Sequence, residues 1–214
     1  MPVNLSIDGN ATAIEGPRSG IEFFADRKNV VALRVDGELK DLATDLASLP
    51  EGAVVEGVDV SSDDGLNILR HSTAHVLAQA VQQIFPDANL GIGPFIADGF
   101  YYDFGNIDAV TPELLRDLEK RMKRIVKEGQ TFRRREIADA DAAAELAGQP
   151  YKLELVGTKG AGAEGASVEV GGAGLTMYDN CSRDGAVVWT DLCRGPHLPS
   201  TRFIGNGFAL TKAS

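Results

Sequence analysis

The sequence predicts an α+β protein in which a small β-grasp-like domain, residues 1–62, precedes a larger domain of helices and an antiparallel sheet, residues 63–214. Three observations predict this fold class. Short β-branched or alternating segments, separated by turn signals, fill roughly the first 60 residues. After the polar stretch Ser61–Gly65, longer segments appear in which apolar residues recur with helical spacing. Strands and helices do not alternate strictly in the second part, which favours α+β over a parallel, doubly wound sheet.

The first domain is predicted to contain four or five short strands and one short helix. Val3–Ile7 alternates apolar and polar residues and stops at Asp8-Gly9-Asn10, a turn signal that predicts a hairpin. The other predicted elements are, in order, a short helix over Ser19–Asp26, strands over Val30–Val35 and Leu39–Leu42 joined at Asp36-Gly37, and a strand over Val54–Val60.

Two longer helices are predicted in the second domain. The first is capped by Asp63 or Asp64 and ends before Pro86. The second begins at Thr111, with a proline in its first turn, and stops at Gly129. In the first helix, the apolar stripe and two histidines are predicted to lie on nearly opposite faces. The remaining predictions are a short helix over Ala140–Ala147, strands over Phe100–Phe104, Tyr151–Val156, Leu175–Tyr178, Val187–Leu192 and Phe208–Leu210, and a mobile hairpin extension over Gly157–Gly174.

Composition and charge limit the partners that the chain can have. The net charge of −10 at first disfavours nucleic acid, but residues 1–64 hold 13 acidic and 5 basic residues and account for most of it. Residues 120–135 hold eight basic residues and one acidic residue, a pattern typical of a solvated helix face, with RNA contact as the alternative. No apolar run approaches the ~20 residues of a membrane helix, the N-terminus lacks the features of a secretion signal, and two cysteines form no disulfide framework. These features favour a cytoplasmic protein without a membrane partner.

All three histidines and one of the two cysteines fall in two short spacings, H-x3-H and C-x3-H. His71 and His75 lie four residues apart on a predicted helix, so their side chains point the same way. Cys193 and His197 flank an Arg-Gly-Pro segment that cannot lie inside a helix, and a tight loop would present both to one place. This set suits Zn²⁺, and it equally suits a metal-free acid–base and nucleophile cluster. Cys181 belongs to neither spacing and is predicted to be an inert, half-buried thiol.

Five segments of this sequence resemble the amino-terminal half of bacterial threonyl-tRNA synthetases. They are, in order, HSTAHVLAQAV, GIGPFIADGFYYDF, LEKRMKRIVKEG, YKLEL and DLCRGPH. The resemblance covers residues 66–212 and is most specific at DLCRGPH and in the glycine-phenylalanine-tyrosine block. Residues 1–60 are similar in kind to the leading β-grasp module of that family, the TGS domain.

The resemblance implies an editing domain that hydrolyses serine wrongly attached to the acceptor end of threonine tRNA. A water held by the histidine and cysteine cluster would attack the ester, Lys152 would stabilise the oxyanion, and Asp191 would hold the lysine or the substrate ammonium. No metal would be required, although alanyl-type editing domains bind zinc with the same histidine and cysteine layout. By position in the motifs, the catalytic residues would be His71, His75, Lys152, Asp191, Cys193 and His197, and the substrate contacts would be Tyr102 and Arg194.

The sequence departs from the family in two places. It ends at Ser214, where the family continues into a catalytic and an anticodon-binding domain, so the resemblance implies a fragment whose partners include those domains. The stretch Gly157–Gly174 separates Lys152 from the cysteine loop and leaves the position of this lysine open. Two other functions also remain open, namely an alanyl-type or free-standing deacylase and a non-catalytic module that binds tRNA or zinc.

Overall fold

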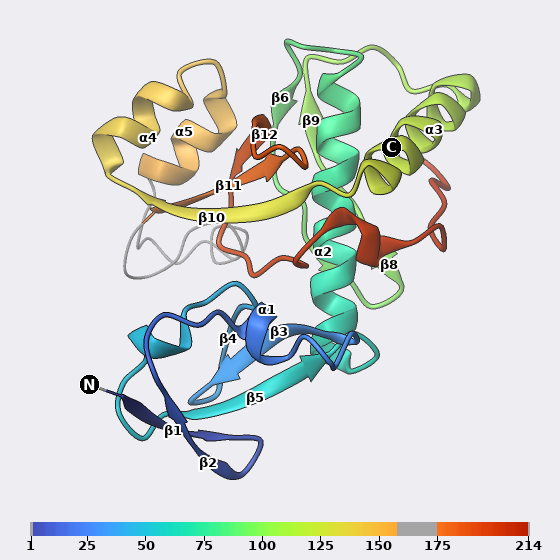
Figure 1. Cartoon of the computed structure of the whole chain (residues 1–214). Coiled ribbons are helices and arrows are strands. Elements are labelled where there is room, and N and C mark those ends of the chain that lie inside the picture. The colour runs from blue at the N-terminus through green and yellow to red at the C-terminus, as the bar shows by residue number, and fades with distance from the viewer. Residues whose placement is uncertain (1, 158–174, 214) are drawn as a thin grey trace. The chain divides into compact units, whose positions relative to one another are not determined.

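The structure is a computed structural model that describes residues 2–157 and 175–213 (Figure 1). These residues divide into two compact units. One unit comprises Met1–Leu69 with Pro196–Pro199, and the other comprises Arg70–Gly195 with Ser200–Ser214. The domain boundary expected between residues 62 and 63 stays a prediction. The predicted α+β class is confirmed, because both units combine helices with antiparallel strand pairs.

The first unit contains a five-stranded sheet with the strand order β2-β1-β5-β3-β4. Strands β1 and β5 run parallel, and the other neighbours are antiparallel, as in the predicted β-grasp-like fold. The hairpin turn at Asp8 and Gly9 has positive φ angles of 47° and 80°, which suit a two-residue hairpin. The elements are β1 (Val3–Ile7), β2 (Asn10–Ile14), α1 (Gly20–Phe23), β3 (Val30–Val35), β4 (Glu38–Asp41), η1 (Leu46–Ser48) and β5 (Val54–Asp59).

The second unit is built on the antiparallel sheet β10-β11-β12, with two short strand pairs, β6-β9 and β7-β8. Most of α2 belongs to this unit, and residues 71–81 of the helix are buried on every side. The elements are α2 (Asp63–Gln82), β6 (Asn89–Leu90), β7 (Phe95–Ile96), β8 (Gly99–Phe100), β9 (Phe104–Gly105), α3 (Pro112–Glu128), β10 (Thr131–Ile137), α4 (Asp139–Glu145), α5 (Pro150–Gly157), β11 (Leu175–Cys181), β12 (Val187–Leu192) and η2 (Thr201–Ile204).

The β10-β11-β12 sheet packs an apolar cluster on one face and makes a polar contact with α2 on the other. On one face, Leu175, Met177 and Leu192 form an apolar cluster with residues of α4 and α5. Because side chains alternate along a strand, Asn180 of β11 points the other way, and its amide donates a hydrogen bond to Gln79 of α2 over 2.8 Å. The face of the sheet toward α2 is therefore polar, and the candidate site lies on this face.

Helix α3 follows its sequence signals closely. The Thr111 hydroxyl accepts a hydrogen bond from the Leu114 amide at the N-terminus, and Pro112 occupies the first turn. At the other end Gly129 adopts a left-handed conformation with a φ of 68°. The buried side chains of α3 recur every three or four residues, as predicted.

Three strand predictions differ from the structure, and one strand has no prediction. Tyr151–Val156 lies in helix α5, where Pro150 occupies the first turn and Leu153, Leu155 and Val156 pack against the apolar cluster. Phe100–Phe104 is interrupted, because β8 ends at Phe100 and β9 begins at Phe104. Phe208–Leu210 forms no strand. Strand β10 was not predicted at all. Most of the segment Gly157–Gly174, predicted to be a mobile hairpin, lies outside the described residues.

The charges of β10 explain why its sequence does not resemble a buried strand. Arg133 and Arg135 reach across to Asp179 of β11, and Arg135 also pairs with Glu145. Burial alone would raise the pKa of Asp179, but hydrogen bonds from Thr190, Arg133 and Arg135 outweigh it and hold this pKa below its ordinary value. Ion pairs and backbone hydrogen bonds therefore hold the strand in the sheet. Its sequence lacks the alternating apolar residues from which a strand is usually predicted.

Candidate active site

Helix α2 places His71 and His75 on one side, with their ring centroids 5.1 Å apart. Both side chains are buried. The Nδ1 atom of His71 lies 3.0 Å from the carbonyl oxygen of Gly93, and its Nε2 lies 3.0 Å from the sulfur of Cys193. Because a carbonyl oxygen only accepts, this contact assigns a proton to Nδ1 and leaves Nε2 to face the thiol. The sequence predicts the two histidines on the face of α2 opposite the apolar stripe, and in the structure both faces of the helix are buried over residues 71–81.

Cys193 lies directly after β12, in a tight loop that backbone amides stabilise. Its amide donates to the carbonyl of Thr176, and the Gly195 amide points at its sulfur over 3.3 Å. Gly195 has a φ of 71°, and a Cβ atom there would lie 1.9 Å from the Tyr178 hydroxyl. Only glycine fits this position, so the Arg-Gly-Pro segment folds back and turns the chain toward His197.

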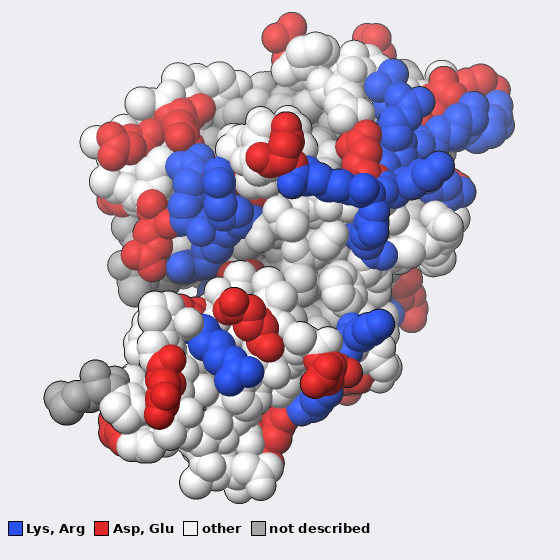
Figure 2. Space-filling view, in the orientation of Figure 1, with Lys and Arg blue, Asp and Glu red and all other residues white. Residues whose placement is uncertain are grey.

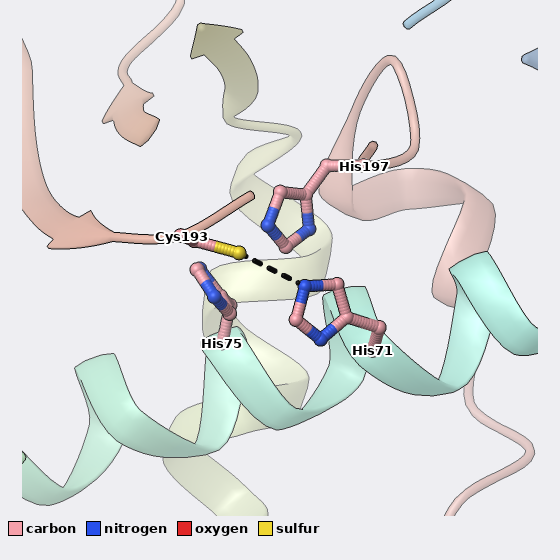
Figure 3. A group of neighbouring side chains, drawn as sticks. All are labelled: His71, His75, Cys193 and His197. Carbon is pink, nitrogen blue, oxygen red and sulfur yellow. Dashed lines mark hydrogen bonds between the residues drawn. The ribbon is translucent and has the colours of Figure 1, made fainter. Parts of the chain in front are cut away.

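His71, His75, Cys193 and His197 come together, and their potential ligand atoms all lie within 4.8 Å of one another (Figure 3). All four side chains are buried. Tetrahedral zinc ligands lie roughly 3–4 Å apart, given metal–ligand distances of about 2.0–2.3 Å. Three imidazoles and a thiol in this volume therefore fit one zinc ion after small adjustments. The carbonyl of Gly93 behind His71 is the kind of outer contact that orients a histidine ligand.

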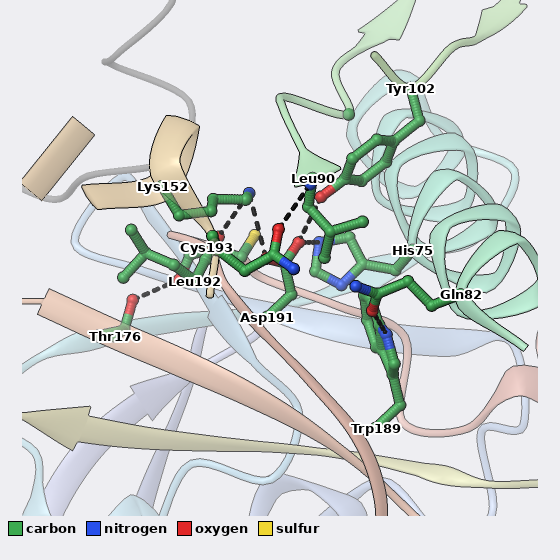
Figure 4. Close-up of polar contacts among 12 residues, drawn as sticks. His75, Gln82, Leu90, Tyr102, Lys152, Thr176, Trp189, Asp191, Leu192 and Cys193 are labelled. Carbon is green, nitrogen blue, oxygen red and sulfur yellow. Dashed lines mark hydrogen bonds and ion pairs between the residues drawn. The ribbon is translucent and has the colours of Figure 1, made fainter. Parts of the chain in front are cut away.

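Lys152 and Asp191 form a second, buried polar group (Figure 4). The Lys152 ammonium lies 3.2 Å from Oδ1 of Asp191 and donates to the carbonyl of Leu192 over 3.1 Å. The hydroxyl of Tyr102 donates to Oδ2 of Asp191 over 2.6 Å. One ammonium and one carboxylate thus balance each other's charge, which is the condition for burying charged groups. Gly93 makes room for the Tyr102 ring, since a Cβ there would lie 2.3 Å from a ring carbon.

Asp191 connects the two groups. It precedes Cys193 by two residues, and its Oδ2 lies 3.9 Å from Nε2 of His75. This separation is longer than a hydrogen bond but short enough for a direct electrostatic interaction. Arg194, predicted to contact the substrate, is exposed beside the cysteine. Cys181 lies on β11 outside the group of four and is fully rather than half buried, and burial raises the pKa of its thiol.

Sequence reasoning missed Trp189, a neighbour of His75, and Gln82, which binds Trp189. The indole ring of Trp189 meets the His75 ring edge-to-face, with centroids 5.5 Å apart and an interplanar angle of 87°. The Trp189 Nε1–H donates to Oε1 of Gln82 over 2.7 Å. A sequence signal exists for each, because Trp189 shares a strand face with Asp191, and Gln82 follows His75 by seven residues on the helix.

The helical part of the basic run, residues 120–128, forms an exposed surface on α3, whereas Arg133, Arg134 and Arg135 lie on β10. Figure 2 shows Lys and Arg side chains gathered over this helix. Lys123, Lys127 and Arg202 line a shallow hollow there together with Gly205 and Asn206. Lys123 pairs with Glu119 and Lys120 with Asp117, so part of this charge is balanced within the helix. Among the helices in the part of the chain that the structure describes, none combines the length and apolar character needed to cross a membrane.

Comparisons with known proteins agree on one family. A model of the threonyl and alanyl tRNA synthetase second additional domain matches residues 168–214. The chain is 59% identical over 218 residues to a threonine–tRNA ligase of Cutibacterium acnes, an alignment that covers 100% of the chain and 31% of that protein. Threonine–tRNA ligases of Leifsonia xyli and Streptomyces griseus are 60% and 58% identical, over 91% and 86% of the chain and 28% of each relative. The chain thus spans less than a third of the length of these relatives, and it is homologous to a region of the threonyl-tRNA synthetase family that contains the second additional domain.

Proposed function

We propose that this chain hydrolyses the ester bond of serine wrongly attached to threonine tRNA. The observation that carries the proposal is the position of Asp191. This carboxylate pairs with Lys152, lies 3.9 Å from Nε2 of His75, and precedes Cys193 by two residues. Imidazoles able to accept a proton and a cation able to stabilise an oxyanion therefore converge on one buried place.

In the proposed reaction, a water molecule attacks the ester carbonyl carbon while one of His71 and His75 accepts its proton. The tetrahedral intermediate carries a negative oxygen, which the Lys152 ammonium stabilises while Asp191 keeps that ammonium in place. The bond from carbon to the ribose oxygen then breaks, and the ribose oxygen takes up the proton. The products are free serine and uncharged tRNA. Cys193 orients the substrate, and no covalent step is needed because an aminoacyl ester is already activated.

The need for such a reaction follows from the similarity of the two amino acids. Threonine differs from serine by one methyl group, which contributes only about 1–3 kcal/mol of discrimination in a single binding step. A second site that hydrolyses the smaller product multiplies the selectivity. We propose that Tyr102 and Arg194 contact the substrate and that a clash with the extra methyl group excludes threonine.

The rest of the chain has proposed roles in the same reaction. The relatives are named threonine–tRNA ligases, so we propose that this region works beside catalytic and anticodon-binding domains in the cytoplasm. The first unit would be a TGS module, and the exposed cations of α3 would contact the acceptor arm of the tRNA. These assignments account for a basic surface on a chain whose net charge is negative.

Zinc is the metal that the four-residue group would hold, through His71, His75, Cys193 and His197. When bound, zinc would supply a polarised water and a fixed positive charge. We propose that hydrolysis does not require it. Deacylation that survives exhaustive treatment with a chelator, in protein shown by elemental analysis to be free of metal, is the expected result. Loss of activity that one equivalent of zinc restores would contradict this part of the proposal.

The decisive experiment measures deacylation of seryl-tRNA and threonyl-tRNA, both on threonine tRNA, by this chain and its variants. We expect rapid release of serine, sparing of threonine, and a loss of at least about 10²-fold in His75→Ala and Cys193→Ala. Cys181→Ala is the matched control, because it removes the other buried thiol, and it should retain full activity. Equal hydrolysis of both esters would refute the specificity, and tRNA binding without hydrolysis would favour a binding module.

A further inference from the structure

Four polar side chains form a stripe along one side of α2, namely His71, His75, Gln79 and Gln82. Their spacings of four, four and three residues place them on the same face over three helical turns. His71 and His75 belong to the proposed catalytic group. The two glutamines continue the stripe along the polar face of the sheet, and the proposed reaction does not use them.

Both glutamines bind the sheet through hydrogen bonds. Gln79, itself 2% exposed, accepts from the amide of Asn180 over 2.8 Å. Gln82 accepts from the indole of Trp189 over 2.7 Å and donates from Nε2 to the carbonyl of Ala88 over 3.1 Å. The indole can only donate and the carbonyl can only accept, so this pair of partners fixes which end of the Gln82 amide faces which neighbour.

His75 contacts two other rings. The His71 ring centroid lies 5.1 Å from that of His75 with an interplanar angle of 67°. The Trp189 ring centroid lies 5.5 Å from it with an interplanar angle of 87° (Figure 4). An imidazole turns about its last side-chain torsion with only broad preferences, so its plane is set by what it touches. The edge-to-face contact with Trp189 restricts that rotation as long as the indole itself stays in place.

We propose that Trp189 is a positioning residue for His75 and that Gln82 holds Trp189 in the required orientation. This inference rests on the proposed function, in which His75 acts at the ester. The line of contacts runs from the Ala88 carbonyl through the Gln82 amide and the indole to the imidazole. It keeps the His75 ring turned toward Asp191 and the reacting centre, and it touches no part of the substrate.

Steady-state deacylation kinetics test the proposal. Trp189→Leu removes the ring that contacts His75. It should lower kcat by roughly 10- to 100-fold and change KM by less than about twofold, because misplacing a catalytic group by about 1 Å can cost on the order of 10²-fold. Trp189→Phe keeps a ring but loses the anchor, and it should retain clearly more activity than the leucine variant. Val188→Ala, which changes the exposed preceding residue, is the control and should behave as the parent protein.

A double-variant cycle tests the role of Gln82. Gln82→Met and Trp189→Phe each break the same hydrogen bond, so each should lower kcat by a similar factor, and the double variant should be no worse than either. Additive effects would overturn the anchoring role. A leucine variant with unchanged kcat, an effect confined to KM, or equal activity of the leucine and phenylalanine variants would overturn the positioning role. Should Trp189→Leu fail to fold, the milder substitutions of the cycle decide.

Nuclear magnetic resonance tests the geometry without any reaction. The chain has one tryptophan and three histidines, so the indole N–H gives one signal and each imidazole can be assigned by substitution. We expect Gln82→Met to shift the indole signal and speed its exchange, and Trp189→Leu to move the ring signals of His75 more than those of His197. Unmoved His75 signals would refute the positioning. Failure of the parent chain to deacylate, with these shifts present, would refute the proposed function alone.

Discussion

Lys152 is completely buried, and its surroundings show why the site depends on paired residues. Its ammonium contacts the Asp191 carboxylate and the Leu192 carbonyl, while Tyr102 binds the other carboxylate oxygen. An isolated buried charge is strongly unfavourable, so removing either partner leaves the other in a medium that cannot solvate it. The pair thus has a structural role in addition to its proposed role in hydrolysis.

This pairing gives a testable prediction. Lys152→Met should lower the free energy of unfolding by about 3–5 kcal/mol, because it leaves the Asp191 carboxylate buried and unbalanced. Adding Asp191→Asn should recover part of that loss, since the amide is neutral and its oxygen can still accept from Tyr102. Urea unfolding of the two single variants and the double variant provides the measurement. A double variant as unstable as the sum of the singles would show that the two charges do not depend on each other.

The predictability of individual site residues varied with the distance between partners along the chain. His71 and His75 share a helix face, and Cys193 and His197 share a loop, so local spacing was enough to single them out. Lys152 had no distinguishing local pattern, and only the family resemblance pointed to it, because its partner lies 39 positions away. Trp189 was missed for the same reason, since its contacts with His75 and Gln82 are all long-range.

At the scale of elements, local signals succeeded where caps and apolar spacing agreed. Helix α3 has a threonine cap, a proline in the first turn and a glycine at its end, and the prediction matched its bounds. The prediction failed at helix α5, because apolar residues at alternate positions in so short a segment suit both a strand and a helix packed on an apolar cluster. The sequence does not predict strand β10, because ion pairs with Asp179 take the place of the apolar face by which strands are usually identified.

The ion pairs of Asp179 make the sheet sensitive to acid. The folded state holds the pKa of this carboxyl below its ordinary value, so its stabilising effect is fully present above the unfolded pKa and is lost as the pH falls through the folded pKa. Asp179→Asn should therefore cost about 1–3 kcal/mol near neutrality and progressively less in acid. Thermal unfolding of both proteins between pH 7 and about pH 3 checks this. A difference independent of pH would contradict it.

For the whole molecule, the uneven charge predicts how binding to tRNA responds to salt. Pairing of cations with phosphates weakens as salt rises, and each phosphate that a lysine or arginine neutralises adds about one unit to the logarithmic slope. Lys123→Gln with Lys127→Gln, in the hollow beside Arg202, should reduce the slope by about two. Lys28→Gln with Lys40→Gln makes the same change in charge in the first unit and should leave the slope unaltered. Equal slopes for the two pairs would rule out α3 as the surface that binds tRNA.

The outer end of β12 has a consequence for how the protein behaves in concentrated solution. Among the described residues β12 pairs in the sheet only with β11, and Val187 and Val188 are 50% and 48% exposed at its start. An edge strand with bare β-branched side chains is a template on which another copy can add a strand. We expect self-association to begin at this edge, and the charged side chains of Arg183 and Asp184, in the turn just before it, are the residues placed to oppose that growth.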